Sequence, residues 1–191
     1  MNSFKTVAAL VSLCLLQACG TVSNRYASSN ISPELMASKD KALVLMSTGA
    51  PKSCVSTATM VVARDFASGQ MVDPIISIAV DAYVHTSEFP DHHGLVSAFP
   101  IAPGSYYFVP AIANPLVKGV RTPTFRFEAK AGEATYIGEL FMLASCALHG
   151  QFEVRDEYER DLKEATARNK AFGDKVVVKR LMRVGEPINA K

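Results

Sequence analysis

Along most of this chain, short apolar runs follow one another and are separated by closely spaced turn signals, and this pattern limits the folds that the chain can adopt. From Lys41 onward the runs cover residues 42–46, 55–63, 75–84, 95–99, 105–113, 124–129, 134–142 and 151–155. Pairs such as Pro103-Gly104 and Ala131-Gly132 recur between them at intervals too short to hold a helix. The pattern predicts a mainly β domain built from short strands.

Alternation within the runs indicates how the strands pack. Phe125 and Phe127 alternate with Arg126 and Glu128, as expected for a strand with one buried face and one solvated face. We therefore expect residues 41–184 to form a two-sheet antiparallel β-sandwich.

One amphipathic helix is predicted near the C-terminus, over about residues 156–172. Its apolar positions fall on a single stripe, and Gly173 would supply a left-handed stop. The stripe contains Tyr158, Leu162, Ala165 and Phe172. We expect residues 175–182 to form a final strand at a sheet edge and residues 185–191 to form a loose tail.

The N-terminal residues 1–18 are typical of a signal peptide. Lys5 gives a positive start, and the apolar run 6–16 is shorter than the roughly 20 residues that a membrane span needs. The run ends in Leu16-Gln17-Ala18-Cys19-Gly20, which resembles the lipobox of bacterial lipoproteins. That resemblance implies cleavage before Cys19 and attachment of lipid to this cysteine. An ordinary secretory signal cut elsewhere, or a buried helix, is the alternative.

The lipobox resemblance also implies a location. Lipid on Cys19 would hold the protein on a membrane of the bacterial cell envelope. Gly20 in place of an acidic residue resembles outer-membrane lipoproteins, so we expect an outer-membrane protein that faces the periplasm. Residues 19–40 are rich in Ser and Asn and are expected to form a flexible tether, with a helical turn over 33–38 as the alternative.

Two cysteines remain in the expected mature chain besides the lipidated one, because Cys14 lies in the signal peptide. In an oxidising periplasm Cys54 and Cys146 are expected to form a disulfide. Closing so long a loop would stabilise the fold by roughly 4–5 kcal/mol. Two unpaired thiols are the alternative, since spacing does not show whether the residues meet.

Two phrases of the sequence resemble a family. Residues 100–107, Pro-Ile-Ala-Pro-Gly-Ser-Tyr-Tyr, are similar to a turn entering a strand, and residues 125–140 are similar to a strand pair containing Gly132-Glu133, Tyr136 and Gly138. Both are similar to small bacterial lipoproteins of unknown function whose domain is a prealbumin-like or carboxypeptidase-regulatory-like sandwich. The resemblance implies an immunoglobulin-like arrangement of two sheets and brings no catalytic residues.

The best candidate for site chemistry is Asp91-His92-His93, together with His85 upstream. Histidine and aspartate are metal ligands and acid–base groups, but adjacent histidines in a strand point to opposite faces. An exposed loop without function is therefore the favoured interpretation. No nucleophile elbow, phosphate-binding loop or zinc-protease helix occurs, so no cofactor is expected.

Taken together, these patterns favour a lipid-anchored, non-enzymatic binding or assembly module that docks another envelope protein. A net charge of +2 gives no reason to expect nucleic acid. One alternative is a metal-dependent or carbohydrate-acting enzyme that uses the histidine loop. Another is a small-ligand carrier with a cavity lined by aromatic residues, of which Tyr83, Phe89, Phe99, Tyr106, Tyr107 and Phe108 are the candidates.

Overall fold

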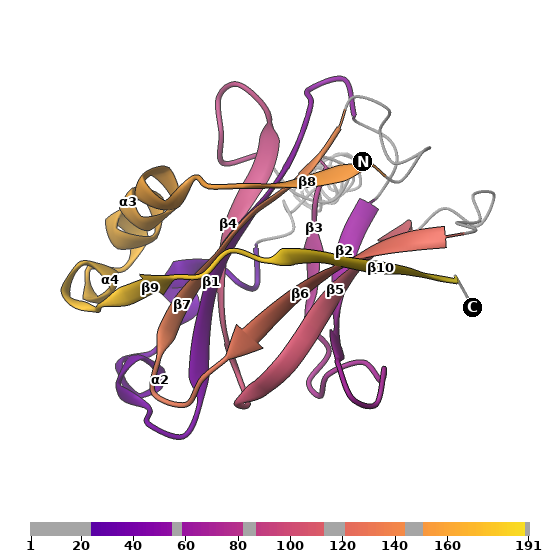
Figure 1. Ribbon diagram of the computed structural model, residues 1–191. Helices are drawn as coiled ribbons and strands as arrows, with labels where there is room; N and C mark the ends of the chain where they lie inside the picture. Colours follow the sequence, from indigo (N-terminus) through magenta and orange to yellow (C-terminus); the bar gives the residue numbers. More distant parts are fainter. Residues whose placement is uncertain (1–23, 55–58, 82–86, 113–120, 144–150, 190–191) are drawn as a thin grey trace, which may run out of the picture.

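The computed structural model describes residues 24–54, 59–81, 87–112, 121–143 and 151–189, and these form two β-sheets packed face to face (Figure 1). The expectation of a mainly β, two-sheet sandwich is confirmed. The first sheet, sheet A, runs in the order β4 (His93–Ile101), β1 (Ala42–Ala50), β7 (Ala134–Met142) and β8 (Phe152–Arg155), with β9 (Val177–Lys179) also paired to β7. The second, sheet B, runs β10 (Arg183–Asn189), β6 (Arg121–Ala129), β5 (Gly104–Ile112), β2 (Thr59–Asp65) and β3 (Ser77–Ala79).

The strand directions differ between the sheets. Sheet B is antiparallel throughout, as the sequence predicts. In sheet A the pairs β1–β7 and β7–β9 are parallel, so this sheet is mixed rather than antiparallel. Alternation reports which face of a strand is buried and carries no information on the direction of its neighbour, which is why the sequence missed the parallel pairs.

Sheet A is covered on both faces. Its inner face packs against sheet B, and its outer face packs against the helices (Figure 1). These are η1 (Ser28–Asn30), α2 (Pro33–Ala37), α3 (Tyr158–Arg168) and α4 (Ala171–Asp174). Every residue of the central strands β1 and β7 is consequently buried.

The predicted helix is present, but it ends earlier than expected. Ala165 and Phe172 of the predicted stripe are buried against sheet A, which confirms the face assigned to the helix. The chain leaves α3 at Asn169, whose side-chain amide donates to the carbonyl oxygens of Ser28 and Ile31. The stop therefore comes from a tertiary contact, and Gly173 lies within the short helix α4.

The expected flexible tether is wrong from residue 24 onward. Tyr26, Ile31 and Met36 are buried in the two cores, and residues 24–40 contain η1 and α2. The segment has few large apolar side chains, so its composition is typical of a linker. Each of them nevertheless fills a place on the sandwich that local sequence does not reveal.

The expected loose tail is also wrong over residues 185–189, because β10 pairs with β6 as an edge strand of sheet B. The run Gly185-Glu186-Pro187 lacks the alternation of a strand. It coincides with an irregularity of the ladder between Gly185 and Ile188, where the register shifts. A proline is tolerated there because an edge strand need not donate on its open side.

Within the described ranges, no helix combines the length and the apolar character required to cross a membrane.

Candidate functional site

A β-bulge in β7 creates the most unusual feature of the structure, a buried glutamate on the helix side of sheet A. Leu45 of β1 pairs with Tyr136, whereas Ser47 pairs with Glu139, so β7 carries one extra residue between these pairs. Gly138 sits in this bulge with φ +100°, a conformation that favours glycine. The extra residue places Glu139 on the same face of the sheet as Tyr136, under α3, rather than in the core between the sheets.

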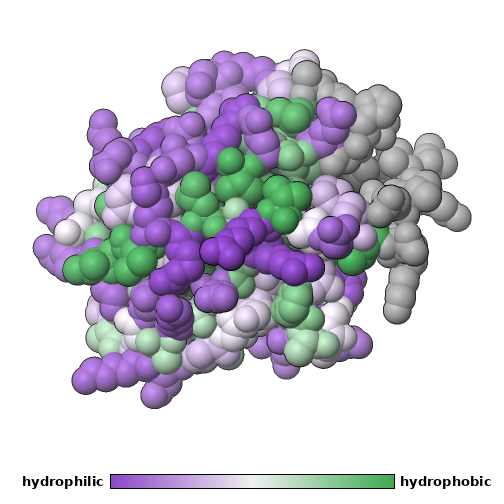
Figure 2. All heavy atoms as spheres, in the orientation of Figure 1, coloured by the Kyte–Doolittle hydropathy of each residue, from purple (hydrophilic) through white to green (hydrophobic). Residues whose placement is uncertain are grey.

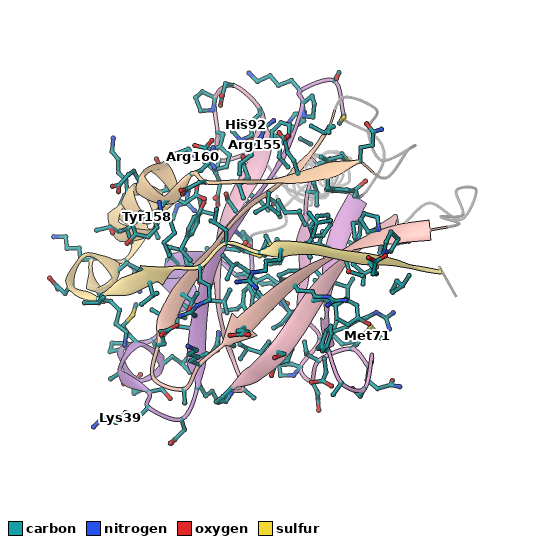
Figure 3. All side chains as sticks on the ribbon, in the orientation of Figure 1. Lys39, Met71, His92, Arg155, Tyr158 and Arg160 are labelled. Atoms are coloured by element: carbon teal, nitrogen blue, oxygen red, sulfur yellow. The ribbon has the colours of Figure 1, made fainter. Side chains whose placement is uncertain are left out.

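Helix α3 brings a second buried carboxylate and an arginine to the same place. Asp161 and Glu139 are both completely buried, and the guanidinium group of Arg160 contacts both. Figure 3 shows Arg160 beside His92 and Arg155 at one end of α3. We refer to the group as the Glu139–Asp161 cluster, and its members are Ser47, His92, Tyr136, Glu139, Arg160 and Asp161.

Each oxygen of Asp161 is hydrogen-bonded. Oδ2 accepts from the hydroxyl groups of Ser47 at 2.5 Å and Tyr136 at 2.8 Å. Oδ1 accepts from Nε of Arg160 at 2.9 Å. The Tyr136 hydroxyl oxygen in turn accepts from the backbone N–H of Glu157, just before α3. These bonds fasten the start of the helix to the two central strands of sheet A.

Glu139 is less completely satisfied. Its Oε1 accepts from Nη2 of Arg160 at 2.9 Å and lies 3.3 Å from Nε2 of His92. Among the described residues Oε2 has no hydrogen-bond partner, and the nearest cation is Nη1 of Arg155 at 4.0 Å. A buried carboxylate oxygen without a donor is destabilising, so Glu139 is the strained member of the cluster.

Aromatic rings enclose the polar groups. The His92 ring stacks on the Phe89 ring with centroids 4.6 Å apart, and the guanidinium group of Arg160 lies over the same Phe89 ring, 4.2 Å from its centroid. Arg155 lies over Phe141 at 3.4 Å. Gly49 leaves room for this arrangement, because a Cβ atom there would come within 2.5 Å of the Phe141 ring.

Burial controls the proton affinities of the cluster. Loss of hydration raises the pKa of Glu139 above its ordinary value, although Arg160 opposes the rise. Loss of hydration likewise raises the pKa of Asp161, against the hydrogen bond from Ser47. The pKa of Tyr136 is raised by burial and by the neighbouring Asp161, so its hydroxyl stays protonated and donates.

The arrangement is suited to holding the fold together more than to reaching a substrate. The side chains of Glu139 and Asp161 have no exposed surface, and His92 retains only 11% of its side-chain exposure. No group of three or more histidine, cysteine, aspartate or glutamate side chains within the described ranges could hold a metal ion. The described residues therefore place no metal-ligating group around the buried acids, and neither carboxylate is exposed to solvent in this conformation.

The structure does not bring the candidate site residues Asp91, His92 and His93 together. Asp91 is exposed and lies 2.8 Å from Nδ1 of the buried His92. His93 points elsewhere and donates through Nε2 to the carbonyl oxygen of Lys52, so the two histidines do not converge, as their adjacency predicted. His85 lies outside the described residues, and the metal-site hypothesis gains no support from the others.

The disulfide between Cys54 and Cys146 and the lipidation of Cys19 remain predictions. Cys54 is buried in the core between the sheets. Cys146 lies outside the described residues, so its pairing with Cys54 is still an expectation, and so is lipid on Cys19, which also lies outside them.

The two acids of the cluster were missed by sequence reasoning, although each leaves a signal. Glu139 is a charged residue in the middle of the apolar run 134–142. Asp161 lies three residues after Tyr158 and four before Ala165, on the apolar stripe of the helix. A charge at a position that the pattern buries is a sign of a satisfied polar cluster.

Comparison with models of protein families, with curated proteins and with solved structures finds no match for this chain.

Proposed function

We propose that this protein is a lipid-anchored binding or assembly module of the bacterial envelope, without catalytic activity of its own. It sits on the periplasmic side of the outer membrane through lipid on Cys19 and docks another envelope protein. The observation that carries this proposal is an apolar strip on the side of the sandwich opposite the attachment of the N-terminal segment.

The N-terminal segment attaches along one side of the sandwich. Asn24 donates to the carbonyl oxygen of Val96 in β4, and Tyr26 accepts a backbone hydrogen bond from Ala98 in the same strand. The Tyr26 hydroxyl then reaches sheet B, where it donates to Ile75 O and accepts from the N–H of Ser77. The anchor thus leads into the side formed by β4 and β3.

The opposite side is formed by β8 of sheet A and β10 of sheet B, and it faces the viewer in Figure 1. Val154 and Leu181 are half-buried there and flank Gly138. Phe152 is half-buried beside them, and Val184 is 68% exposed. Figure 2 shows a hydrophobic area on this side, bordered by hydrophilic residues. We define Phe152, Val154, Leu181 and Val184 as the apolar strip.

The strip has the character of a protein-binding surface. Apolar side chains that protrude beside charged ones are typical of interfaces, in which an apolar centre is surrounded by a polar rim. The short edge strand β8 borders the strip and adds main-chain groups to which a partner strand can pair. An anchor on one side leaves this side free of the attached N-terminal segment.

The enclosed Glu139–Asp161 cluster supports a module without catalysis. Its acids are engaged in fastening α3 to sheet A, and both are shielded from solvent. Such a cluster gives a rigid body on which a binding surface keeps its shape.

Site-specific crosslinking in the envelope tests the proposal. A photoreactive side chain replaces Val184 in the full-length protein, with Lys163 on the exposed face of α3 as the matched control position. We expect a discrete adduct at position 184 that is absent at position 163. A crosslinker at Ile188 should give an adduct with the same partner, and adding Val184→Glu should abolish that adduct. Equal labelling at both positions, or no adduct at 184, would contradict the proposal.

A further inference from the structure

The outer face of sheet B carries a row of arginines that the strand pairing aligns. Arg183 of β10 pairs with Arg126 of β6, Arg126 pairs with Tyr107 of β5, and Tyr107 pairs with Arg64 of β2. The row ends at Met71, which forms an isolated bridge with Arg64. Because strands lie about 4.8 Å apart, Arg64 and Arg183 are roughly 14 Å apart across the sheet. We call these five residues the arginine row.

No salt bridge of the described residues uses the guanidinium group of Arg64, Arg126 or Arg183. Arg126 lies over the ring of Phe66 at 4.6 Å, and Arg64 donates to the carbonyl oxygen of Gly69. Glu128 lies two residues along β6 on the same face without pairing to any of them. The row is therefore a positively charged strip.

Large apolar side chains are exposed around this charge. Phe66, Met71 and Ile75 are 46%, 49% and 50% exposed, although side chains of this size are usually buried. Figure 3 shows Met71 at the outer margin of sheet B. The described helices pack on sheet A, so none of them covers this face. Arginine beside exposed aromatic and aliphatic side chains is the composition of surfaces that bind the interface of an anionic bilayer.

The chain that precedes the described residues indicates which partner covers the face. Asn24 lies only five positions after Cys19, so lipid on Cys19 would lie within roughly 17 Å of the folded body. The segment that follows is fixed to Ile75 through the Tyr26 hydroxyl. The anchor would thus enter the membrane beside the margin of sheet B that bears the exposed apolar residues.

We propose that the arginine row, with Phe66 and Ile75, lies against a bilayer leaflet that contains anionic phospholipid headgroups. This inference rests on the lipid anchor of the proposed function. The acyl chains hold the protein at the surface, and the arginine row fixes which face meets the headgroups. The apolar strip lies on the β8–β10 side, at an edge of this face, and stays open to a protein partner.

The absence of tryptophan from the chain makes a direct test practicable. Phe66→Trp introduces a single fluorophore on the proposed membrane face, and Val176→Trp introduces one at an 81% exposed position beyond α4. Each full-length lipidated protein is reconstituted into vesicles of phosphatidylcholine alone or with phosphatidylglycerol. Lipids brominated on their acyl chains quench a tryptophan that enters the bilayer.

We expect quenching of Phe66→Trp in the anionic vesicles, little in the zwitterionic ones, and none of Val176→Trp. Arg126→Gln with Arg183→Gln should lower the docked-to-undocked ratio about 25-fold, at about fivefold for each charge near the surface. The exposed pair Lys163→Gln with Lys170→Gln removes the same charge and should leave the ratio unchanged. Salt at 1 M should also release the face, since screening then acts over about 3 Å.

Mass spectrometry of the same samples distinguishes failure of the proposed membrane face from failure of the lipid anchor. If acyl chains are present on Cys19 and Phe66→Trp is not quenched, the membrane face is refuted while the proposed function stands. If Cys19 carries no lipid, the anchor fails and the inference fails with it. A blue-shifted emission without quenching by brominated lipid would indicate a second protein copy on this face and would likewise overturn the inference.

Discussion

Arg160 is the residue on which the Glu139–Asp161 cluster depends, because its guanidinium group lies within 2.9 Å of an oxygen of each buried carboxylate. Arg160→Met keeps the length of the side chain and removes the charge. We expect the free energy of unfolding to fall by about 3–5 kcal/mol, since two buried acids lose their common partner. Urea denaturation followed by circular dichroism measures this change.

Two control variants test whether the loss of stability in Arg160→Met comes from its contacts with the buried carboxylates. Lys163→Met on the exposed face of α3 should change the free energy of unfolding by less than about 0.5 kcal/mol. Adding Glu139→Gln to Arg160→Met should restore part of the loss, because one unpaired charge is removed. If Arg160→Met were as stable as the Lys163→Met control, the cluster would not fasten the helix.

Titration of Glu139 makes the free energy of unfolding depend on pH. Burial raises its native pKa above the unfolded value, so the native state binds the extra proton and Glu139 contributes stability at low pH that is lost as pH rises through the native pKa. Glu139→Gln removes this titration. The free energy of unfolding of the variant minus that of the wild type should therefore increase with pH above about 4.5 and become constant above the native pKa.

Urea denaturation at a series of pH values measures that difference. Glu159→Gln, an exposed substitution in α3, is the control and should show no such rise. A difference that decreased with rising pH would mean that the native pKa of Glu139 is lowered, contrary to its burial.

His92 and Glu139 illustrate what the sequence says at this scale. The adjacency of His92 and His93 predicted that they would point to opposite faces, and they do. No local motif identifies a partner for His92, because Glu139 lies 47 positions away and reaches it only through the bulge at Gly138. Long-range contacts of this kind depend on register, which short motifs do not encode.

At the scale of elements, the N-terminal segment behaves as part of the sandwich. Tyr26 joins sheet B to β4, because its hydroxyl bonds at 3.0 Å to Ile75 O and 3.2 Å to Ser77 N while its carbonyl oxygen accepts from the N–H of Ala98. Tyr26→Phe leaves these backbone groups without that partner, so we expect a loss of about 1–3 kcal/mol. Hydrogen exchange of the Ala98 amide, which donates to Tyr26 O, should accelerate.

Tyr107→Phe is the matched control, because it removes a hydroxyl from the exposed face of sheet B. Its effect on the free energy of unfolding should stay within about 0.5 kcal/mol. Unchanged exchange at Ala98 in Tyr26→Phe would show that the segment is held by other contacts.

Helix α3 and strand β10 show the limits of local patterns for elements. The apolar stripe identified the helix and its buried face, since a period of 3.6 residues is a local property. Its end at Arg168 depends on Asn169 bonding to the N-terminal segment, which is 138 residues away at Ile31. The sequence of β10 lacks the alternation of a strand, and the segment is extended because it pairs with the edge of β6.

For the whole molecule, residues 24–40 should be required for folding. A chain that starts at Lys41 would lose Tyr26, Ile31 and Met36 from the two cores. Burial of Ile31 and Met36 alone contributes roughly 3–6 kcal/mol, which is comparable with the total stability of many domains. We expect this truncated chain to unfold at much lower urea concentration than one that starts at Asn24.

Both truncations lack residues 1–23, including Cys19, so the comparison isolates the packed segment from the proposed anchor. Proteolysis provides a second measure, because a true tether would be cleaved in the longer chain without loss of the folded body. Equal urea midpoints for the two chains would restore the tether interpretation.

Local sequence was enough to predict the class of fold, the buried faces of the strands and the helix near the C-terminus, because apolar residues that recur every 2 or 3.6 positions are a property of short segments. It also carries the predictions of lipid on Cys19 and of the Cys54–Cys146 disulfide. The folded molecule alone reveals the parallel pairing of β1 with β7, the docking of residues 24–40 and the alignment of the arginine row. These features depend on contacts between residues far apart in the chain, whose register is fixed by packing of the whole sandwich rather than by any short segment.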